Sequence, residues 1–294
     1  MAFDAATYTP AEREDYLRLL RDAWGDDTVA DAEFDWWFRG PDGALRSVAW
    51  VDGRVVGAAA HSWLRMILDG REQHVTLSLH AVTDAAARGR GIFASLESKH
   101  EAEAKRAGAA AVISVPAESA GSVFLGKLGW TSIAKLRLWA RPLPRVARPA
   151  QVERVERFDH ADDAAAAWPE NHVVRDREHL TWRYLESPRP YAALRAGGGY
   201  AVVGHKRLRG IPVAYVADIV GEDTRALLRA SLAAARPGSR AVLALPPRSE
   251  RAAYVKAGFV PTPSTLHFMG KALTQPLSPD PNAWRLTLGD TDFF

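Results

Sequence analysis

The alternation of apolar and polar positions predicts several helices and strands in mixed order. A helix is expected over residues 10–24, because Thr9 is a good N-cap and Pro10 suits a first helical position. Two β-hairpins are expected at Asp-Gly turns, since that dipeptide favours a tight connection between strands. Their strands would cover residues 48–51 and 55–60, and residues 66–68 and 74–82.

A glycine-rich turn follows the strand expected at 74–82. Arg88-Gly89-Arg90-Gly91 leads from that strand into a predicted helix. The N-terminus of a helix presents free backbone N–H groups and a partial positive charge, so it attracts anions. Glycines allow unusual φ values and a close approach of the backbone to a phosphate. The turn is therefore a candidate phosphate site. A strand at residues 110–115 and a short helix ending in Lys127-Leu128-Gly129-Trp130 come next.

The second half of the chain repeats segments of the first. Three segments of the first half, beginning at residues 35, 111 and 126, have counterparts beginning at residues 181, 241 and 255. The last two pairs share an offset of about 130 residues, which indicates two similar folding units. A proline-rich stretch over residues 141–150 separates them and reads as a stiff connector. We therefore expect domains at residues 1–140 and 151–294.

Composition narrows the class of protein. The chain has 294 residues, 47% hydrophobic and 25% charged, as is usual for a globular protein. A net charge of +3 without a basic run argues against a nucleic-acid partner. The absence of cysteine excludes disulfides, thiolate metal sites and acyl-cysteine intermediates. No signal peptide and no apolar run of ~20 residues is present, so we expect a cytoplasmic protein without a membrane partner.

The turn and the elements after it resemble the Gcn5-related N-acetyltransferases (GNAT), which transfer acyl groups from acyl-CoA to amines. The resemblance rests on Arg88-Gly89-Arg90-Gly91-Ile92-Phe93, on the strand ending at Pro116, and on Lys127-Leu128-Gly129-Trp130. It implies an α/β fold with a mixed, mainly antiparallel sheet flanked by helices, in two tandem copies. Acetyl-CoA or another acyl-CoA would be the co-substrate, with no metal. The acceptor would be an amine of a small molecule or a peptide, and nothing in the sequence fixes an oligomeric state.

The resemblance also assigns binding roles. The loop Arg88, Gly89, Arg90, Gly91, Ile92 and Phe93 would hold the pyrophosphate, and the backbone of Ala81, Val82 and Thr83 would pair with pantetheine. Phe93 departs from the small residue usual at the end of the family's motif, so its ring either crowds the phosphates or points into the core. In the second half the corresponding position reads Gly221-Glu222-Asp223, and carboxylates there would repel phosphates. We therefore expect only the first copy to bind CoA.

Catalytic candidates come from the strand before the loop. His74, Thr76, Ser78 and His80 recur at a period of two, which places them on one face of a strand. His80, with Ser78 beside it, is the first candidate, because imidazole titrates near neutral pH and is able to accept a proton from an ammonium group. A purely structural His80 is the alternative. Some tandem members of the family use a terminal carboxylate as base, which makes the Phe294 carboxylate, Asp290 and Asp292 further candidates.

One expected group is missing from the first half. The family often protonates the leaving thiolate with a tyrosine, but that position is Leu125 here, whereas Tyr254 and Asp218 stand at the second copy's equivalents of this site and of His80. Two alternatives therefore stay open beside N-acetyl transfer. One is the use of a longer acyl-CoA or an acyl-carrier protein, and the other is a non-catalytic regulator that binds acyl-CoA.

Overall fold

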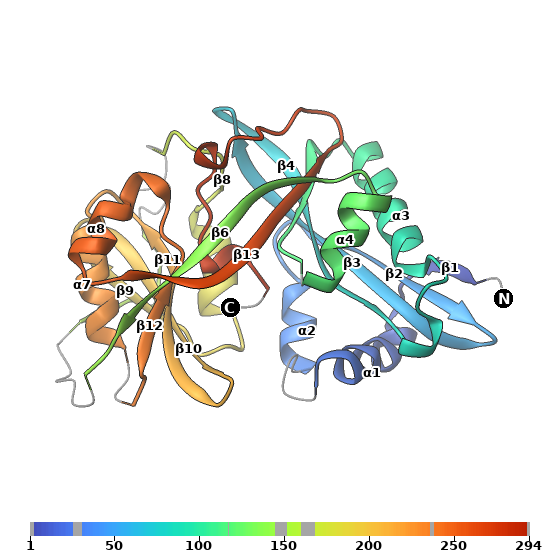
Figure 1. Ribbon diagram of the computed structural model, residues 1–294, viewed down its shortest axis with the longest axis horizontal. Helices are drawn as coiled ribbons and strands as arrows, with labels where there is room; N and C mark the ends of the chain where they lie inside the picture. The colour runs from blue at the N-terminus through green and yellow to red at the C-terminus, as the bar shows by residue number, and fades with distance from the viewer. Residues whose placement is uncertain are drawn as a thin grey trace. The chain divides into compact units, whose positions relative to one another are not determined.

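The computed structural model describes residues 3–25, 31–116, 118–144, 152–159, 168–235 and 238–292 (Figure 1). The chain divides into two compact units, and neither is continuous in sequence. The first unit comprises Met1–Met66, Gln73–Ala134 and His267–Pro279. The second comprises Ile67–Glu72, Lys135–Leu266 and Asp280–Phe294. Of the connector expected at 141–150, residues 145–150 lie outside the described residues.

The first unit is a mixed sheet flanked by helices. Its strands lie in the order β1-β2-β3-β4-β5-β13, in which β5 runs parallel to β4 while β1–β2, β2–β3 and β5–β13 are antiparallel. Figure 1 shows α1 and α2 on one side of β2–β4 and α3 and α4 on the other. The elements are β1 (Asp4–Thr7), α1 (Arg13–Trp24), α2 (Asp31–Trp37), β2 (Ala44–Val51), β3 (Arg54–Leu68), β4 (Arg71–Thr83), α3 (Ile92–Arg106), β5 (Ala111–Ser114) and α4 (Glu118–Lys127).

The local predictions for this unit are confirmed. A 3-10 turn (Pro10–Glu12) precedes α1, and Thr9 and Glu12 form a capping box at its start. Asp-Gly turns join β2 to β3 and β3 to β4, with φ between 48° and 75° at all four turn residues, as tight hairpins require. The strand β3 is longer than expected, because its middle carries His61 and Ser62, which are polar yet buried.

The second unit repeats the central connection of the first. The sequence β10–β11–α7–β12 places β12 parallel to β11, as β3–β4–α3–β5 places β5 parallel to β4. Its strands lie in the order β6-β12-β11-β10-β9-β7. The elements are β7 (Glu153–Arg154), β8 (His172–Val173), α6 (Arg177–Leu180), a π-helical turn (Thr181–Leu185), β9 (Ala192–Ala196), β10 (Gly199–Leu208), β11 (Ile211–Val220), α7 (Thr224–Ala234), β12 (Ala241–Ala244), α8 (Arg251–Lys256) and three 3-10 turns (Arg248–Glu250, Pro281–Ala283, Leu288–Asp290).

Each unit takes a strand from the other half of the sequence. In the first unit, residues 269–272 of β13 (Val260–Ala272) pair antiparallel with β5. In the second unit, residues 139–142 of β6 (Thr131–Pro142) pair antiparallel with β12. Met269 and Phe268 are buried in the first unit, and Met269 packs with Val112, Phe124, Leu128 and Trp130. The sheet of the first unit is therefore complete only when residues 267–272 are present.

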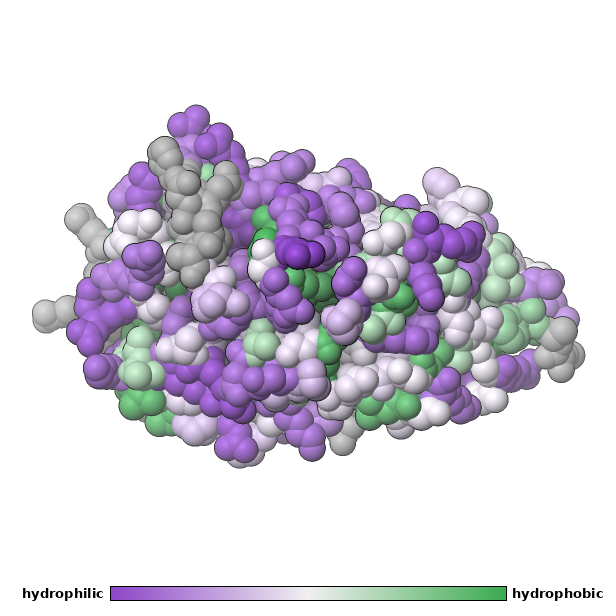
Figure 2. Space-filling view, turned by 90° about the horizontal axis from the view of Figure 1, so that it is seen from above, coloured by the Kyte–Doolittle hydropathy of each residue, from purple (hydrophilic) through white to green (hydrophobic). Residues whose placement is uncertain are grey.

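Polar residues cover most of the face seen in Figure 2, and apolar residues lie between them in small groups. No helix in the described ranges is long and apolar enough to cross a bilayer. Among the same residues, no three or more His, Asp or Glu side chains gather where they would hold a metal ion.

Candidate functional site

The strand β4 extends beyond the end of its parallel neighbour β5, so the last part of one β4 edge is not paired with β5. The pairing runs from Val75↔Ala111 to Leu77↔Ile113. Beyond it, the Ser114 hydroxyl donates to the carbonyl oxygen of Ser78 at 3.0 Å. β5 ends at Ser114, whereas β4 continues to Thr83. Residues 79–83 thus have backbone groups that β5 does not pair.

Two contacts on the other edge show which groups point toward this uncovered side. The Asp84 N–H donates to the Val56 carbonyl at 2.8 Å, and the Val82 carbonyl lies against Gly57. Val82 and Asp84 therefore face β3, and successive residues of a strand alternate between its two edges. Ala81 and Thr83 consequently face the edge that β5 leaves uncovered. An extended ligand would find backbone donors and acceptors there.

The glycine-rich turn has the geometry of an anion site. Arg88, Gly89, Arg90 and Gly91 are all exposed. Both glycines have φ of +80°, as expected from their role in the turn. Gly91 is the N-cap of the fifteen-residue helix α3, and no side chain caps it. The first helical hydrogen bond runs from the Ser95 N–H to Gly91. The preceding N–H groups and the helix dipole are thus directed at the loop.

Phe93 points into the core rather than toward the turn. Its half-buried ring packs edge-on against Phe124, with ring centroids 5.2 Å apart. It belongs to the apolar cluster built around Phe124 and Trp130. Of the two alternatives that the sequence left for this residue, packing in the core is therefore the one observed.

His80 breaks the alternation of its strand. Its φ is +50°, a region that residues other than glycine rarely adopt. Thr76 bonds His61, which in turn bonds Glu97 of α3. The His80 ring is instead enclosed by aromatic rings of α1 and of α2 and the residue after it, with centroids 5.6–6.4 Å away, namely Trp24, Phe34, Trp37 and Phe38.

The four polar residues predicted to share one face of β4 therefore do not all lie in one environment. His74 is exposed, Thr76 and Ser78 are buried, and His80 is buried toward a different helix pair. Polar residues at every second position lie on one face of a regular strand. His80 has a left-handed backbone conformation, so its side chain does not follow that alternation. The catalytic roles of His80 and Ser78 stay predictions.

A buried polar seam, which was not predicted from the sequence, attaches α3 to the sheet. His61 contacts Thr76 at 3.2 Å and Glu97 at 2.9 Å through its two ring nitrogens, and both His61 and Glu97 are fully buried. His100 contacts the Ser47 hydroxyl at 2.9 Å. Burial lowers the pKa of His100 to about 2, with His61 and Lys99 adding to the shift, so the ring is neutral.

The same helix face carries a second buried acid. Glu101 accepts from the Trp130 ring N–H at 2.6 Å and pairs with Lys271 of β13 at 2.5 Å. Glu97, His100 and Glu101 are spaced at three and four residues, which places them on one face of a helix. The spacing in the sequence predicts that the three residues share a helix face, but it does not predict that this face is buried. The seam fixes the helix that carries the loop.

In the second unit, the corresponding helix terminus is occupied by its own carboxylate. Asp223 is the N-cap of α7 and accepts from the Ala226 N–H at 2.9 Å. Beside it, Gly199 and Gly221 pack so closely that a Cβ on either would meet the other strand's backbone. The start of α7 is thus capped by a carboxylate, whereas no side chain caps α3.

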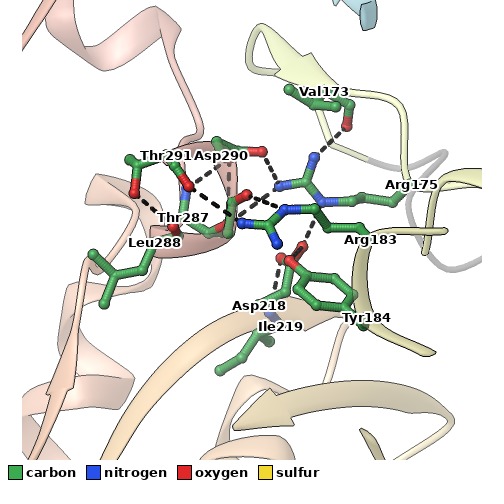
Figure 3. Close-up of polar contacts among 11 residues, drawn as sticks. Val173, Arg175, Arg183, Tyr184, Asp218, Ile219, Thr287, Leu288, Asp290 and Thr291 are labelled. Atoms are coloured by element: carbon green, nitrogen blue, oxygen red, sulfur yellow. Dashed lines mark hydrogen bonds and ion pairs between the residues drawn. The ribbon is translucent and has the colours of Figure 1, made fainter. Parts of the chain in front are cut away.

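The C-terminal segment is anchored in the second unit by a buried ion-pair network (Figure 3). Arg175 is fully buried and contacts Asp218 and Asp290, each at 2.6 Å. The Tyr184 hydroxyl donates to Asp218 at 2.8 Å. Asp290 also accepts from the Thr287 N–H at 2.8 Å. Burial raises the pKa of Asp290, although Arg175 acts in the opposite direction.

This network bears on the other candidate bases. The carboxylate of Asp290 is paired with Arg175, and the Asp292 main-chain carbonyl accepts from Arg189 at 3.0 Å. Phe294 lies outside the described residues. Tyr254 is buried against Phe259, and burial raises the pKa of its hydroxyl. Asp218 and Tyr254 thus have packing and ion-pair contacts within the second unit, and Leu125, the first half's equivalent of Tyr254, is exposed.

Residues 288–290 also cover an edge in the second unit. The paired positions of β11 and β12 are Ala214↔Val242 and Tyr215↔Leu243. Beyond them, Gly289 lies against the Ala217 carbonyl and the Tyr184 hydroxyl, with no room for a Cβ. Gly289 of the second unit's own chain thus lies beside β11, past the paired positions of β11 and β12.

Comparison with known proteins agrees with this geometry. Residues 4–133 match the acetyltransferase (GNAT) domain family. Three solved structures have a similar fold. A conserved protein of Enterococcus faecalis V583 is 10% identical over 93% of this chain and 73% of its own, with a TM-score of 0.67. A GCN5-related N-acetyltransferase of Kribbella flavida is 18% identical over 93% and 71%, with a TM-score of 0.66. Eis1 of Mycobacterium abscessus is 13% identical over 93% and 74%, with a TM-score of 0.62.

No curated protein matches the chain. The similarity to the solved structures is below 25% identity and therefore bears on the fold, which spans most of the chain in each case. The match of residues 4–133 bears on the family, and it includes the uncovered edge of β4 and the loop before α3. The chain therefore carries a GNAT acetyltransferase domain over residues 4–133 and is an acetyltransferase.

Proposed function

We propose that the protein transfers an acetyl group from acetyl-CoA to an amine of a small molecule or a peptide. The observation that carries the proposal is that, in the first unit, one strand ends in both features that the co-substrate needs. The edge of β4 at Ala81–Thr83 offers backbone groups for the pantetheine arm, and the loop from Arg88 to Phe93 offers N–H groups and two arginines for the pyrophosphate. The two lie five residues apart in sequence.

The chain's contribution to the reaction is orientation and polarisation. The amine nitrogen forms the new C–N bond while the thioester C–S bond breaks and its electron pair leaves with sulfur. The ammonium proton passes to a base, for which His80, Asp290, Asp292 and the terminal carboxylate of Phe294 stay the candidates. Holding amine and thioester in contact supplies several kcal/mol, and a backbone N–H directed at the carbonyl oxygen adds about 3 kcal/mol.

We further propose that each chain binds one CoA, in the first unit. The Asp223 carboxylate caps the second unit's helix, and residues 288–290 lie along the second unit's edge. Both contacts support an asymmetric pair of copies. Calorimetric titration with CoA should therefore give a stoichiometry of one per chain, and two equivalent sites would contradict the asymmetry.

The activity is tested by measuring release of the CoA thiol with acetyl-CoA and a panel of primary amines. The expected result is amine-dependent thiol release together with an acetylated amine identified by mass. Replacing acetyl-CoA by longer acyl-CoA esters or an acyl-carrier protein tests the choice of donor. Saturable CoA binding without thiol release from any donor would refute the enzyme and favour a regulator.

A further inference from the structure

The peptide group between His80 and Ala81 is held from one side by helix α1. Tyr16 is fully buried, and its hydroxyl donates to the His80 carbonyl oxygen at 2.9 Å. Its ring packs edge-on against Phe34 and Tyr8, with centroids 5.1 and 6.1 Å away. Burial raises the pKa of this hydroxyl well above its usual range. The hydroxyl therefore keeps its proton and remains a donor at any ordinary pH.

Fixing one end of a peptide group fixes the other. The described backbone has no cis peptide bond, and in a trans peptide the C=O and N–H point in opposite directions. The Ala81 N–H thus points away from Tyr16. The contacts of Val82 and Asp84 with β3 independently place Ala81 at the edge that β5 leaves uncovered.

The backbone at this point needs support. His80 has a φ of +50°, and a residue other than glycine keeps such a strained conformation only where its surroundings hold it. The hydrogen bond from the buried Tyr16 hydroxyl to the His80 carbonyl oxygen stabilises this conformation. It thereby holds the His80–Ala81 peptide group in its orientation.

We propose that Tyr16 is a positioning residue for acyl transfer, which it serves by presenting the Ala81 N–H to the thioester carbonyl oxygen. This inference rests on the proposed function. As the amine forms the C–N bond, the carbonyl electron pair moves onto oxygen, and the Ala81 N–H donates to that oxygen until the C–S bond breaks. A hydrogen bond accepted by the His80 carbonyl also polarises the N–H of the same peptide group. Tyr16 gives up no proton in the reaction.

The test compares Tyr16→Phe with Tyr8→Phe, a matched control on the neighbouring ring. Two stable ligands are used. Acetyl-dethia-CoA keeps the carbonyl in place, and S-ethyl-CoA has a methylene there. We expect the wild type to bind the first more tightly, and Tyr16→Phe to reduce that preference while its affinity for CoA itself changes less than about twofold. Turnover should fall about 10-fold, less than the 10²–10³-fold typical of losing an oxyanion donor.

The outcomes are distinct. A wild type that releases no thiol with any amine refutes the proposed function, and the ligand preference then still tests the role of Tyr16. A folded Tyr16→Phe protein with an unchanged preference overturns the inference. If that variant shows no cooperative melting, the test is made on wild-type protein labelled with ¹⁵N-alanine, by following the amide resonance of Ala81. Its resonance should shift with acetyl-dethia-CoA more than with S-ethyl-CoA, and equal shifts overturn the inference.

Discussion

Mild acid should destabilise the first unit through His100 in the seam beneath α3. His100 is buried in this seam, against Ser47, His61 and Lys99, and its pKa is lowered to about 2. In the unfolded chain the pKa of the same ring is about 6.5. The folded state thus disfavours the charged ring, and the stability that comes from a neutral His100 is present above pH ~6.5 and is lost as the pH falls toward 2.

The magnitude follows from the pH interval. Each unit below ~6.5 costs about 1.4 kcal/mol while the folded ring stays neutral. Lowering the pH from 7.5 to 5.0 therefore removes about 2 kcal/mol through this residue alone. His100→Gln keeps a group able to bond Ser47 but binds no proton, so it should lose about 2 kcal/mol less over the same interval. Taking the difference between the two pH values cancels the cost of the substitution itself.

The assay is urea unfolding of both proteins at pH 7.5 and 5.0, with His74→Gln as control because His74 is exposed on β4. The control should follow the wild type. Equal acid losses in wild type and His100→Gln would refute the burial argument.

Three further predictions concern the site and the sheet. Changing both Arg88 and Arg90 to Glu should weaken CoA binding strongly by calorimetry, since carboxylates would lie beside the pyrophosphate; unchanged affinity would contradict the loop assignment. A fragment of residues 1–140 should be poorly soluble or inactive, because it lacks residues 267–272 and exposes the edge of β5, whereas a stable, fully active fragment would contradict this. His80→Gln should lower turnover by ~10²–10⁴-fold with CoA affinity unchanged if His80 is the base. Full turnover in His80→Gln, with loss of turnover on removing the last five residues of an otherwise folded protein, would favour a C-terminal base.

Features set by neighbouring residues were predictable from the sequence. The Asp-Gly turns need two adjacent residues with positive φ, and the loop before α3 needs glycines at Gly89 and Gly91, so each can be identified in a short window. The first helix likewise depends on Thr9 and Pro10. These elements carry their own conformational preference, and the structure agrees with all of them.

Features set by distant residues were not predictable. The His80 carbonyl oxygen accepts from Tyr16, which lies 64 positions away, and the pair Lys271–Glu101 joins residues separated by 170 positions. The strand exchange is hidden for a similar reason. β6 and β13 follow equivalent helices, and either one presents backbone groups able to extend a sheet beside β5 or β12. The sequence pattern of a strand does not predict which other strand it pairs with.

The two units show how one arrangement of strands and helix leads to different chemistry. Both place a helix after a strand that outlasts its parallel neighbour. In the first unit the edge of β4 is uncovered by β5 and α3 begins at an uncapped glycine, so a ligand with an extended arm and an anionic end meets unused donors. In the second unit the Asp223 carboxylate accepts from the Ala226 N–H at the start of α7, and Gly289 lies against the Ala217 carbonyl of β11. A hydrogen-bonding group is costly to leave unsatisfied only where it is buried. The loop of the first unit is exposed, so water satisfies its donors until an anion takes the place of that water.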